Sequence, residues 1–211
     1  IRLSLVGSEM CIRDSYWMMG LLSLITILLA HGCSSSNKVK QVFKYDVSGE
    51  RYTAYNIWFT APERVYAINY KKGGFIPAGT RVKNVKIRQG KSIIDRGQPI
   101  IIFTVVAEDQ YYIMHFQMGF HPNKTAKDYV DYAFTEKSFE EMTTGFTNDE
   151  ILAIQQGEIK NGMCKEAVLM SYGYPPEHIN TSLENKKWIY WNDRNRSFDV
   201  CFDESDRTID C

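Results

Sequence analysis

The sequence predicts an α+β fold in two parts: a small all-β barrel over residues 51–120, and two helices packed on a three-stranded antiparallel sheet over residues 147–211. Two observations support this prediction. The first part consists of short β-branched and aromatic runs separated by Pro, Gly or charged clusters, whereas the second shows helical periods followed by strand-like alternation. Residues 121–146, where the period becomes helical, are expected to form a helical connector.

The first 50 residues are expected to lie outside this fold. Residues 1–15 show no period, cap or partner segment, which indicates an adapter-derived sequencing artefact or, alternatively, a disordered extension. Residues 16–32 contain an apolar run of about 13 residues, whereas a membrane-spanning helix needs about 20, so they predict a signal peptide. Residues 33–50 are polar and are expected to be a tether.

The signal segment ends in Ala30-His31-Gly32-Cys33, which resembles a bacterial lipobox. The resemblance implies that Cys33 is acylated, for example with palmitate, and becomes the first residue of the mature protein. Two acyl chains hold a protein durably on a membrane, since each buried CH₂ contributes ~0.8 kcal/mol. Ser34 stands where Asp would favour the inner membrane, so the outer membrane is implied, with the body on the periplasmic side. An ordinary signal peptide with an incidental cysteine is the alternative.

Five short runs predict the strands of the barrel, namely YTAYNIWF, RVYAINY, TRVKNVKI, PIIIFTVV and YYIMHFQ. The segment FIPAGT at residues 75–80 resembles a turn of SH3-like barrels in bacterial cell-envelope proteins, where Pro and Gly lead into the next strand. This resemblance implies that the barrel is SH3-like.

Helical spacing begins after the last of these runs. Ala126, Tyr129, Val130, Ala133 and Phe134 recur at the spacing of one helix face. They predict an amphipathic helix in the connector.

The C-terminal helices are predicted from their end signals. Thr147 and Glu150 fit a capping box, and Gly157 is expected to end the helix that follows. Gly173 and the prolines after it are expected to end a second helix. The predicted elements are helices at 148–156 and 165–172 and strands near 187–192, 196–203 and 207–211.

This order of elements, with its punctuation, resembles the SmpA/OmlA (BamE-like) family over residues 147–211. The positions that carry the resemblance are Gly162, Met163, Val168, Gly173, Pro175 and Trp188. Cys164 departs from the pattern, because Ser or Thr usually follows the Gly-Met pair and caps the helix. The family implies a non-catalytic binding or scaffold protein of the outer membrane, in outer-membrane protein assembly or envelope integrity. Because the same fold occurs in secreted inhibitors, a periplasmic enzyme-inhibitor or sequestering protein is the alternative.

Charge and motifs exclude several function classes. The chain has 25 basic and 25 acidic side chains, which gives no electrostatic footprint for nucleic acid. His115 and His121 lack a further ligand pair at metal spacing and are expected to be surface or half-buried histidines. The acidic stretch at 203–206 predicts a solvated hairpin turn. No enzyme, metal or cofactor is expected, and the expected partners are the membrane, through the lipid, and a protein.

The cysteines of the C-terminal part predict one disulfide. Strand alternation places Cys201 outward and places Cys211 inward together with Ile209, so these two cysteines are not expected to pair. We expect a disulfide between Cys164 and Cys211, with free thiols as the alternative. Catalysis by Cys164 with His178 is not expected, since no third group orients the pair.

The strand Trp188-Ile189-Tyr190-Trp191 carries large apolar groups on both faces, although a three-stranded sheet with helices on one side has one core to fill. Ile189 and Trp191, or the opposite pair, are therefore expected to pack on the barrel or on an external partner. In the inhibitor alternative, this strand and the loop 177–187, which contains His178, enter an enzyme cleft.

Overall fold

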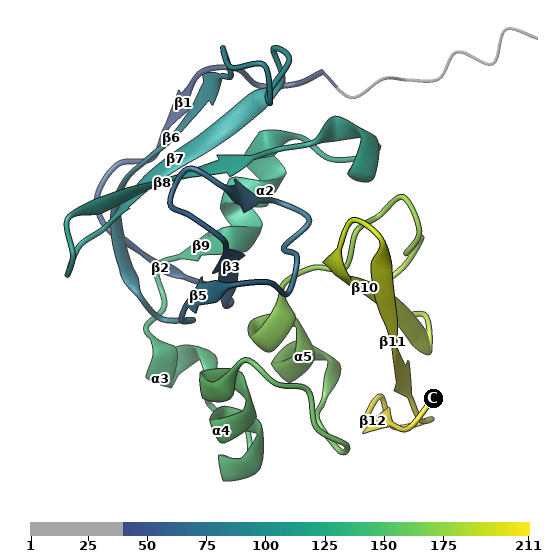
Figure 1. Cartoon of the computed structure of the whole chain (residues 1–211). Helices are drawn as coiled ribbons and strands as arrows, with labels where there is room; N and C mark the ends of the chain where they lie inside the picture. The colour runs from purple at the N-terminus through teal and green to yellow at the C-terminus, as the bar shows by residue number, and fades with distance from the viewer. Residues whose placement is uncertain (1–39) are drawn as a thin grey trace, which may run out of the picture. The chain divides into compact units, whose positions relative to one another are not determined.

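Nine strands form one curled sheet in the computed structural model, which describes residues 40–211 (Figure 1). The order is β5-β3-β4-β8-β7-β6-β2-β9, with β1 also paired to β6. Only the pair β4 and β8 is parallel. The strands are β1 (Tyr45–Asp46), β2 (Arg51–Thr53), β3 (Ile57–Phe59), β4 (Val65–Tyr66), β5 (Gly74–Ile76), β6 (Arg81–Gln89), β7 (Pro99–Val105), β8 (Gln110–His115) and β9 (Phe134–Thr135).

The expected adapter segment, the signal peptide and the lipidated Cys33 lie outside the described residues. The segment 33–50, expected as a tether, is described from residue 40 and contains β1, where Tyr45 lies opposite Ile87 of β6. Val42, Tyr45 and Val47 pack against the core of the sheet.

Alternation of side chains gives the central strands one buried face. Along β7, Ile101, Phe103 and Val105 are buried, while the residues between them are only partly covered. The short helix η1 (Met118–Phe120) follows β8.

Helix α2 (Ala126–Ala133) covers this buried face (Figure 1). The predicted helix face is confirmed, because Ala126, Tyr129, Val130 and Ala133 are all buried, and Phe134 follows them into the same core. A capping box between Thr125 and Asp128 starts the helix.

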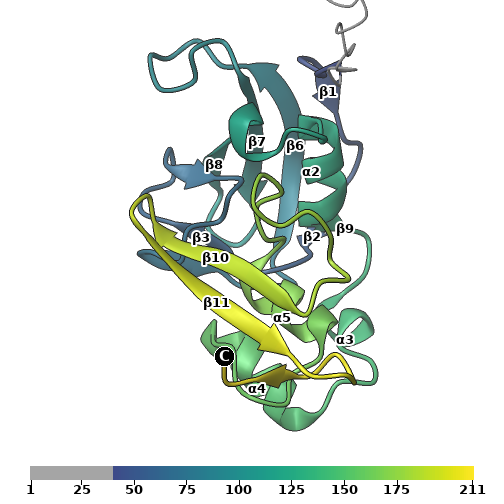
Figure 2. The ribbon, with the colours of Figure 1, turned by 90° about the vertical axis from the view of Figure 1, so that its right-hand side faces the viewer.

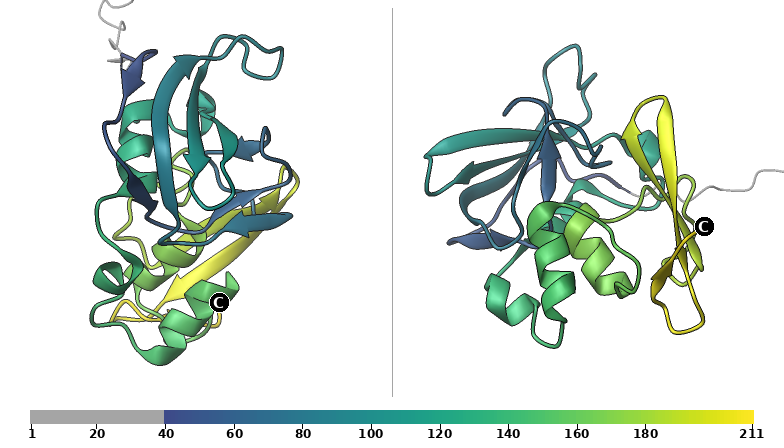
Figure 3. Two further views of the ribbon diagram at one scale, coloured as in Figure 1. Left: turned by 90° about the vertical axis from the view of Figure 1, so that its left-hand side faces the viewer. Right: turned by 60° about the horizontal axis from the view of Figure 1, so that its bottom comes forward.

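A second core lies in what we call the C-terminal layer. Figures 2 and 3 show its helices beside its three strands. Its core includes Ile154, Val168, Trp188, Tyr190 and Phe202. The elements here are α3 (Phe139–Met142), which precedes the layer, then α4 (Asn148–Gln156), α5 (Lys165–Tyr172), β10 (Lys187–Asp193), β11 (Arg196–Phe202) and β12 (Thr208–Ile209). Within residues 40–211, none of the helices combines the length and apolar character needed to cross a bilayer.

The predicted fold class is wrong, although α4, α5, β10 and β11 lie close to their predicted positions. The first part is a nine-stranded mixed sheet and not a small SH3-like barrel, since β2 pairs with β9 from beyond the predicted barrel and β4 pairs in parallel with β8. The second part is likewise not a free-standing unit of two helices on three strands. Hydrogen bonds from Asn56 and Asn69 join its helices to the part of the chain that forms the large sheet. The chain as described is mostly β, with a nine-stranded sheet and a second, three-stranded sheet.

Buried Asn69 joins the large sheet to α5. Its Nδ2 donates to the carbonyl of Tyr172, the last residue of α5, at 2.6 Å and to the carbonyl of Asn56 at 2.9 Å. Its Oδ1 accepts from the N–H of Trp58 at 2.8 Å. Gly173 allows this approach, because its φ is +77° and a Cβ there would lie 2.9 Å from Asn69 Nδ2. Asn69 therefore satisfies a carbonyl that a helix end leaves without a partner.

Asn56 makes the matching contacts with both helices. Its Nδ2 donates to the carbonyl of Ile154 in α4 at 2.6 Å, and its backbone N–H donates to Met170 of α5 at 3.0 Å. Its Oδ1 accepts from the N–H of Ala78 at 2.8 Å. We call the contacts of Asn56 and Asn69 the polar boundary.

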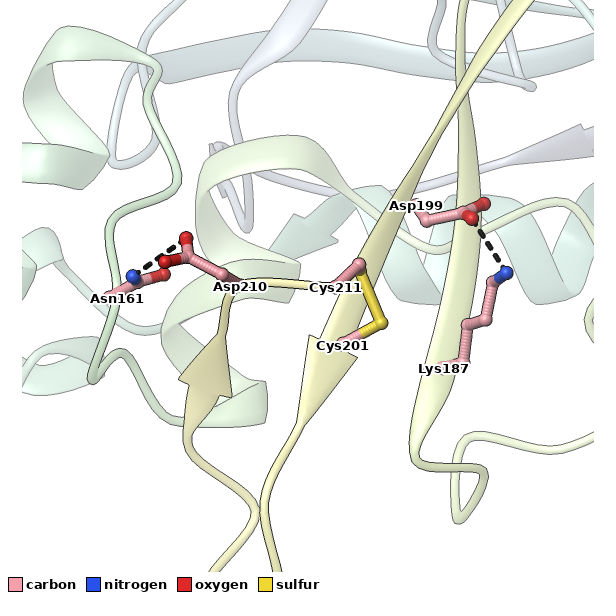
Figure 4. Close-up of a disulfide and its surroundings, with 6 residues drawn as sticks. All are labelled: Asn161, Lys187, Asp199, Cys201, Asp210 and Cys211. Carbon is pink, nitrogen blue, oxygen red and sulfur yellow. Dashed lines mark hydrogen bonds and ion pairs between the residues drawn. A yellow bond between two sulfur atoms is a disulfide. The ribbon is translucent and has the colours of Figure 1, made fainter.

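The disulfide joins Cys201 and Cys211, with the Cα atoms 5.2 Å apart, so the predicted Cys164–Cys211 pair is wrong (Figure 4). The error lies in the assigned strand face. Cys201 is opposite Ile209 in the ladder, and directly opposite residues share a face. Ile209 is accordingly exposed, and Cys211 follows past the end of β12 on the same side as Cys201. Figure 4 also shows the Lys187–Asp199 ion pair, 2.6 Å long, nearby.

Candidate functional site

The two faces of β10 have different surroundings. Trp188 and Tyr190 are 0% and 2% exposed and belong to the core of the C-terminal layer. Ile189 and Trp191 lie on the other face and are half-buried. The backbone of Ile189 is paired with the side chain of Asn180, with bonds of 2.8 and 2.9 Å. Among the predicted partner-binding residues, only Trp191 and His178 therefore come together at a cavity.

That cavity, which we call the Trp191 cavity, has a volume of about 440 Å³. Its walls come from β10, from the loop after β4, from the turn after β8 and from the loop before β10. Backbone bonds fix these walls, because Lys71 donates to the carbonyl of Trp191 at 3.1 Å and His178 donates to that of Phe120 at 3.1 Å. The lining residues are Ile68, Tyr70, Gln117, Phe120, His178, Trp191 and Arg194.

A second cavity of about 410 Å³, which we call the Arg64 cavity, lies at the turn between β10 and β11. Tyr66 and Tyr70 meet edge to face in it, with ring centroids 5.8 Å apart. Its lining residues are Trp58, Phe59, Thr60, Arg64, Tyr66, Tyr70, Lys72, Asp193, Arg194 and Asn195.

The two cavities adjoin each other, because Tyr70 and Arg194 line both. We call the pair the aromatic groove. Each cavity lies within the roughly 300–1,000 Å³ range of ligand sites in proteins, and each has the mixture of aromatic walls and a few polar groups that such sites have.

Three buried polar atoms of residues lining the groove have no hydrogen-bond partner. They are Trp58 Nε1, Gln117 Oε1 and Trp191 Nε1, and in the described part of the chain only two other side-chain atoms are left in the same state. Buried polar groups are normally paired, and an unpaired one costs about 1–3 kcal/mol. Two donors and one acceptor without partners therefore belong to residues that line the groove, and because each atom is buried, a ligand reaches it only if the side chain moves.

The groove is positively charged. Arg64, Lys72 and Arg194 are exposed, and none of them has an ion-pair partner within residues 40–211. Asp193 is the one acid among the lining residues, and it is already engaged. Hydrogen bonds from the backbone N–H of Asn195 and the side chain of Arg196 lower its pKa, and Arg196 lies 2.6 Å from its carboxylate.

Two histidines outside the groove are structural. His115 bonds Asp95 through Nδ1 and the carbonyl of Glu63 through Nε2, the latter at 2.8 Å. His121 bonds the hydroxyl of Tyr129 at 2.6 Å, and burial, followed by the charge of His178, lowers its pKa to about 3. Both side chains are buried, so the prediction that they are surface or half-buried is wrong.

Cys164 is poorly placed for nucleophilic chemistry. Burial, with a smaller contribution from the charge of Glu150, raises the pKa of its thiol to about 11, so the reactive thiolate is disfavoured near neutral pH. His178 lines the groove, away from this thiol, and contacts Phe120 and Trp191. No group of three or more His, Cys, Asp or Glu side chains in residues 40–211 could hold a metal ion.

Sequence reasoning missed most of the groove. Arg194 stands in a hairpin turn, where a charged residue is ordinary, and Gln117 follows a strand. Tyr70 lies in the loop after β4, and only the fold brings that loop against β10. The one usable signal was the second apolar face of β10, which singled out Ile189 and Trp191, and of these two residues Trp191 lines a cavity.

Models of protein families, curated proteins and solved structures give no match to this chain. The groove must therefore be interpreted from its own chemistry.

Proposed function

We propose that this chain is a cell-envelope lipoprotein, anchored to the outer membrane through Cys33 with its body in the periplasm, that acts as a non-catalytic binding or scaffold protein. Its partner is a protein, and its role lies in outer-membrane protein assembly or envelope integrity. The aromatic groove is the binding site.

One observation carries the binding role: three of the five unpaired buried polar atoms of the described residues belong to residues that line the groove. A core that served only stability would be expected to pair these atoms or replace them with apolar groups. A partner whose binding exposes these atoms and supplies the missing hydrogen bonds offsets their cost.

The disulfide supports an exported location. Cys201 and Cys211 are bonded near the C-terminal end of the chain, and disulfides of this kind persist in oxidising compartments such as the periplasm. This agrees with a signal segment that ends in a lipobox-like sequence. The high pKa of Cys164 argues against the one thiol chemistry that the sequence suggested.

The test is a crosslinked pull-down from native outer membranes with the lipid-bearing chain and a C-terminal tag. Recovery of a specific protein that is lost with Trp191→Ala supports the proposal. Ile209→Ala is the matched control, because Ile209 is exposed and lines neither groove cavity. Recovery that does not depend on Trp191 overturns the assignment of the groove, and extraction of the chain without detergent overturns the lipid anchor.

The inhibitor alternative remains a proposal with less support. It needs a protruding element, whereas the groove is concave, and Trp188 and Tyr190 of the proposed inserting strand are buried. Leu183 is the exposed apolar residue of the loop 177–187. Capture of a soluble hydrolase, lost with Leu183→Ser and kept with Trp191→Ala, would favour the inhibitor function.

A further inference from the structure

The aromatic groove has features that narrow down the class of its ligand. The argument rests on the binding role proposed above and concerns three properties: the charge of the groove, the arrangement of its rings and its unpaired polar atoms.

The positive charge of the groove favours an anionic ligand. Arg64 and Lys72 flank the Arg64 cavity, and Arg194 lines both cavities. No ion pair within residues 40–211 neutralises them, and the carboxylate of Asp193 is held by Arg196. Guanidinium groups bind carboxylates with two parallel hydrogen bonds, so Arg194 can hold one carboxylate at the junction of the two cavities.

The rings of the groove form angled corners that can enclose a side chain of the ligand, and they do not form a flat surface. Tyr66 and Tyr70 stand at 66° to each other in the Arg64 cavity. In the Trp191 cavity, Phe120 and His178 are inclined by 58° with centroids 4.9 Å apart, and His178 covers one side of Trp191. A sugar ring stacks on an open aromatic face, whereas an apolar or aromatic side chain fits an angled corner of rings.

The unpaired atoms match a polypeptide backbone. All three atoms are buried, so they pair with a ligand only when its binding exposes them. Trp191 Nε1 and Trp58 Nε1 then donate to carbonyl groups, and Gln117 Oε1 accepts from an amide N–H. An extended peptide presents both kinds of group along its length, with side chains directed to alternate sides.

From these three properties we infer that the aromatic groove binds an acidic linear segment of a partner protein. One apolar side chain of that segment occupies the Trp191 cavity, a second occupies the Arg64 cavity, and a carboxylate between them pairs with Arg194. Arg64 and Lys72 hold further acidic groups at the rim.

The experiment is isothermal titration calorimetry of the full chain, in detergent micelles, with synthetic peptides. The test peptide alternates Asp with Phe and Leu. One control peptide replaces each Asp with Lys, and another replaces Phe and Leu with Ser. Only the acidic apolar peptide is expected to bind, and its affinity is expected to fall as salt rises, because exposed charges are screened.

Arg194→Gln is expected to weaken this binding by on the order of 10-fold, the typical consequence of losing a hydrogen bond between charged groups. Arg96→Gln is the matched control, because Arg96 is an exposed arginine in another turn that lines neither cavity. The affinity of this variant for the peptide is expected to equal that of the unchanged chain. Trp191→Phe keeps a ring, removes the N–H and is expected to weaken binding a few-fold.

Three results overturn this inference. They are equal binding of the basic peptide, equal loss of affinity in Arg96→Gln and Arg194→Gln, and binding of oligogalacturonate, an anionic glycan, without binding of the acidic peptide. The proposed function has a separate criterion. If the pull-down still depends on Trp191 while no acidic peptide binds, the binding role stands and only the ligand class is wrong.

Discussion

The large sheet meets the C-terminal layer along two stretches that differ in the pairing of their polar groups. In the polar boundary, the amide groups of Asn56 and Asn69 bond the carbonyls that end α4 and α5 and the N–H groups of Ala78 and Trp58. In the aromatic groove, two indole N–H groups and an amide oxygen are buried without partners. The two layers therefore meet along one stretch whose buried amide groups are hydrogen-bonded and along another whose buried polar atoms have no partner.

Under the proposed function, this difference separates a structural contact from a binding contact. Paired buried groups stabilise one arrangement of the two layers, because breaking any of them leaves a desolvated group behind. Unpaired buried groups lower stability for as long as they lack partners. Substitutions in the polar boundary should consequently change the free energy of unfolding, whereas substitutions in the groove should change binding.

The largest expected effect is that of Asn69→Ala. Loss of the side chain leaves the carbonyls of Asn56 and Tyr172 and the N–H of Trp58 without their partner, and alanine tolerates the φ of +54° poorly. We expect the free energy of unfolding in urea to fall by about 4 kcal/mol, given about 1–3 kcal/mol for each unpaired buried group.

Asn84→Ala is the control for backbone strain. Asn84 also has a positive φ, of +57°, but it is exposed. We expect a loss of about 1 kcal/mol from strain alone. If Asn69→Ala cost no more than Asn84→Ala, the polar boundary would not be what joins the two layers.

The polar boundary also shows why the sequence predicted elements better than architecture. The helix ends at Gly157 and Gly173, the capping box at Thr147 and the buried face of α2 depend on neighbours within a few residues, and all are confirmed. The pairing of β2 with β9 joins segments about 80 residues apart along the chain, and no local pattern records such a pairing.

The site shows the same limit at a finer scale. Trp191 can be singled out from the sequence because strand alternation is local, whereas Tyr70 and Arg194 come to line the groove only through contacts between distant loops. The disulfide prediction failed for a related reason. The face of Ile209 was assigned from its apolar character, whereas the ladder register places Thr208 inward opposite Phe202.

The second effect is smaller: acid is expected to lower the free energy of unfolding through Glu150, which lies in a different part of the C-terminal layer. Burial alone would raise the pKa of Glu150, but hydrogen bonds from the N–H groups of Thr147 and Cys164 outweigh it and lower the pKa from 4.5 to about 2. Glu150 also bonds Arg207 at 2.7 Å, so one carboxylate joins α4, α5 and the segment before β12.

Since the folded pKa lies below the ordinary one, this stabilisation is present above pH 4.5 and is lost as the pH falls toward 2. We expect a loss of about 2 kcal/mol across that window, after allowing for solvent screening, measured by urea unfolding at a series of pH values. Glu150→Gln should flatten this part of the profile. Glu141→Gln, in the exposed capping box of α3, should leave it unchanged. An unchanged acid limb in Glu150→Gln would assign the acid sensitivity to other groups.

The smallest expected effect has the opposite sign. Cys164 is the N-cap residue of α5, with extended backbone angles suited to a cap, but its side chain makes no cap hydrogen bond. Serine at this position can accept a hydrogen bond from the first turn of α5, so Cys164→Ser should raise the free energy of unfolding by about 0.5–1 kcal/mol. Cys164→Ala, which removes the thiol without adding an oxygen, separates capping from loss of the thiol. If the stability of the serine variant does not exceed that of the alanine variant, the bond from Cys164 N–H to Glu150, 2.8 Å long, already suffices to hold this helix end. Peptide affinity at the groove should be the same in both variants, because Cys164 lines neither of its cavities.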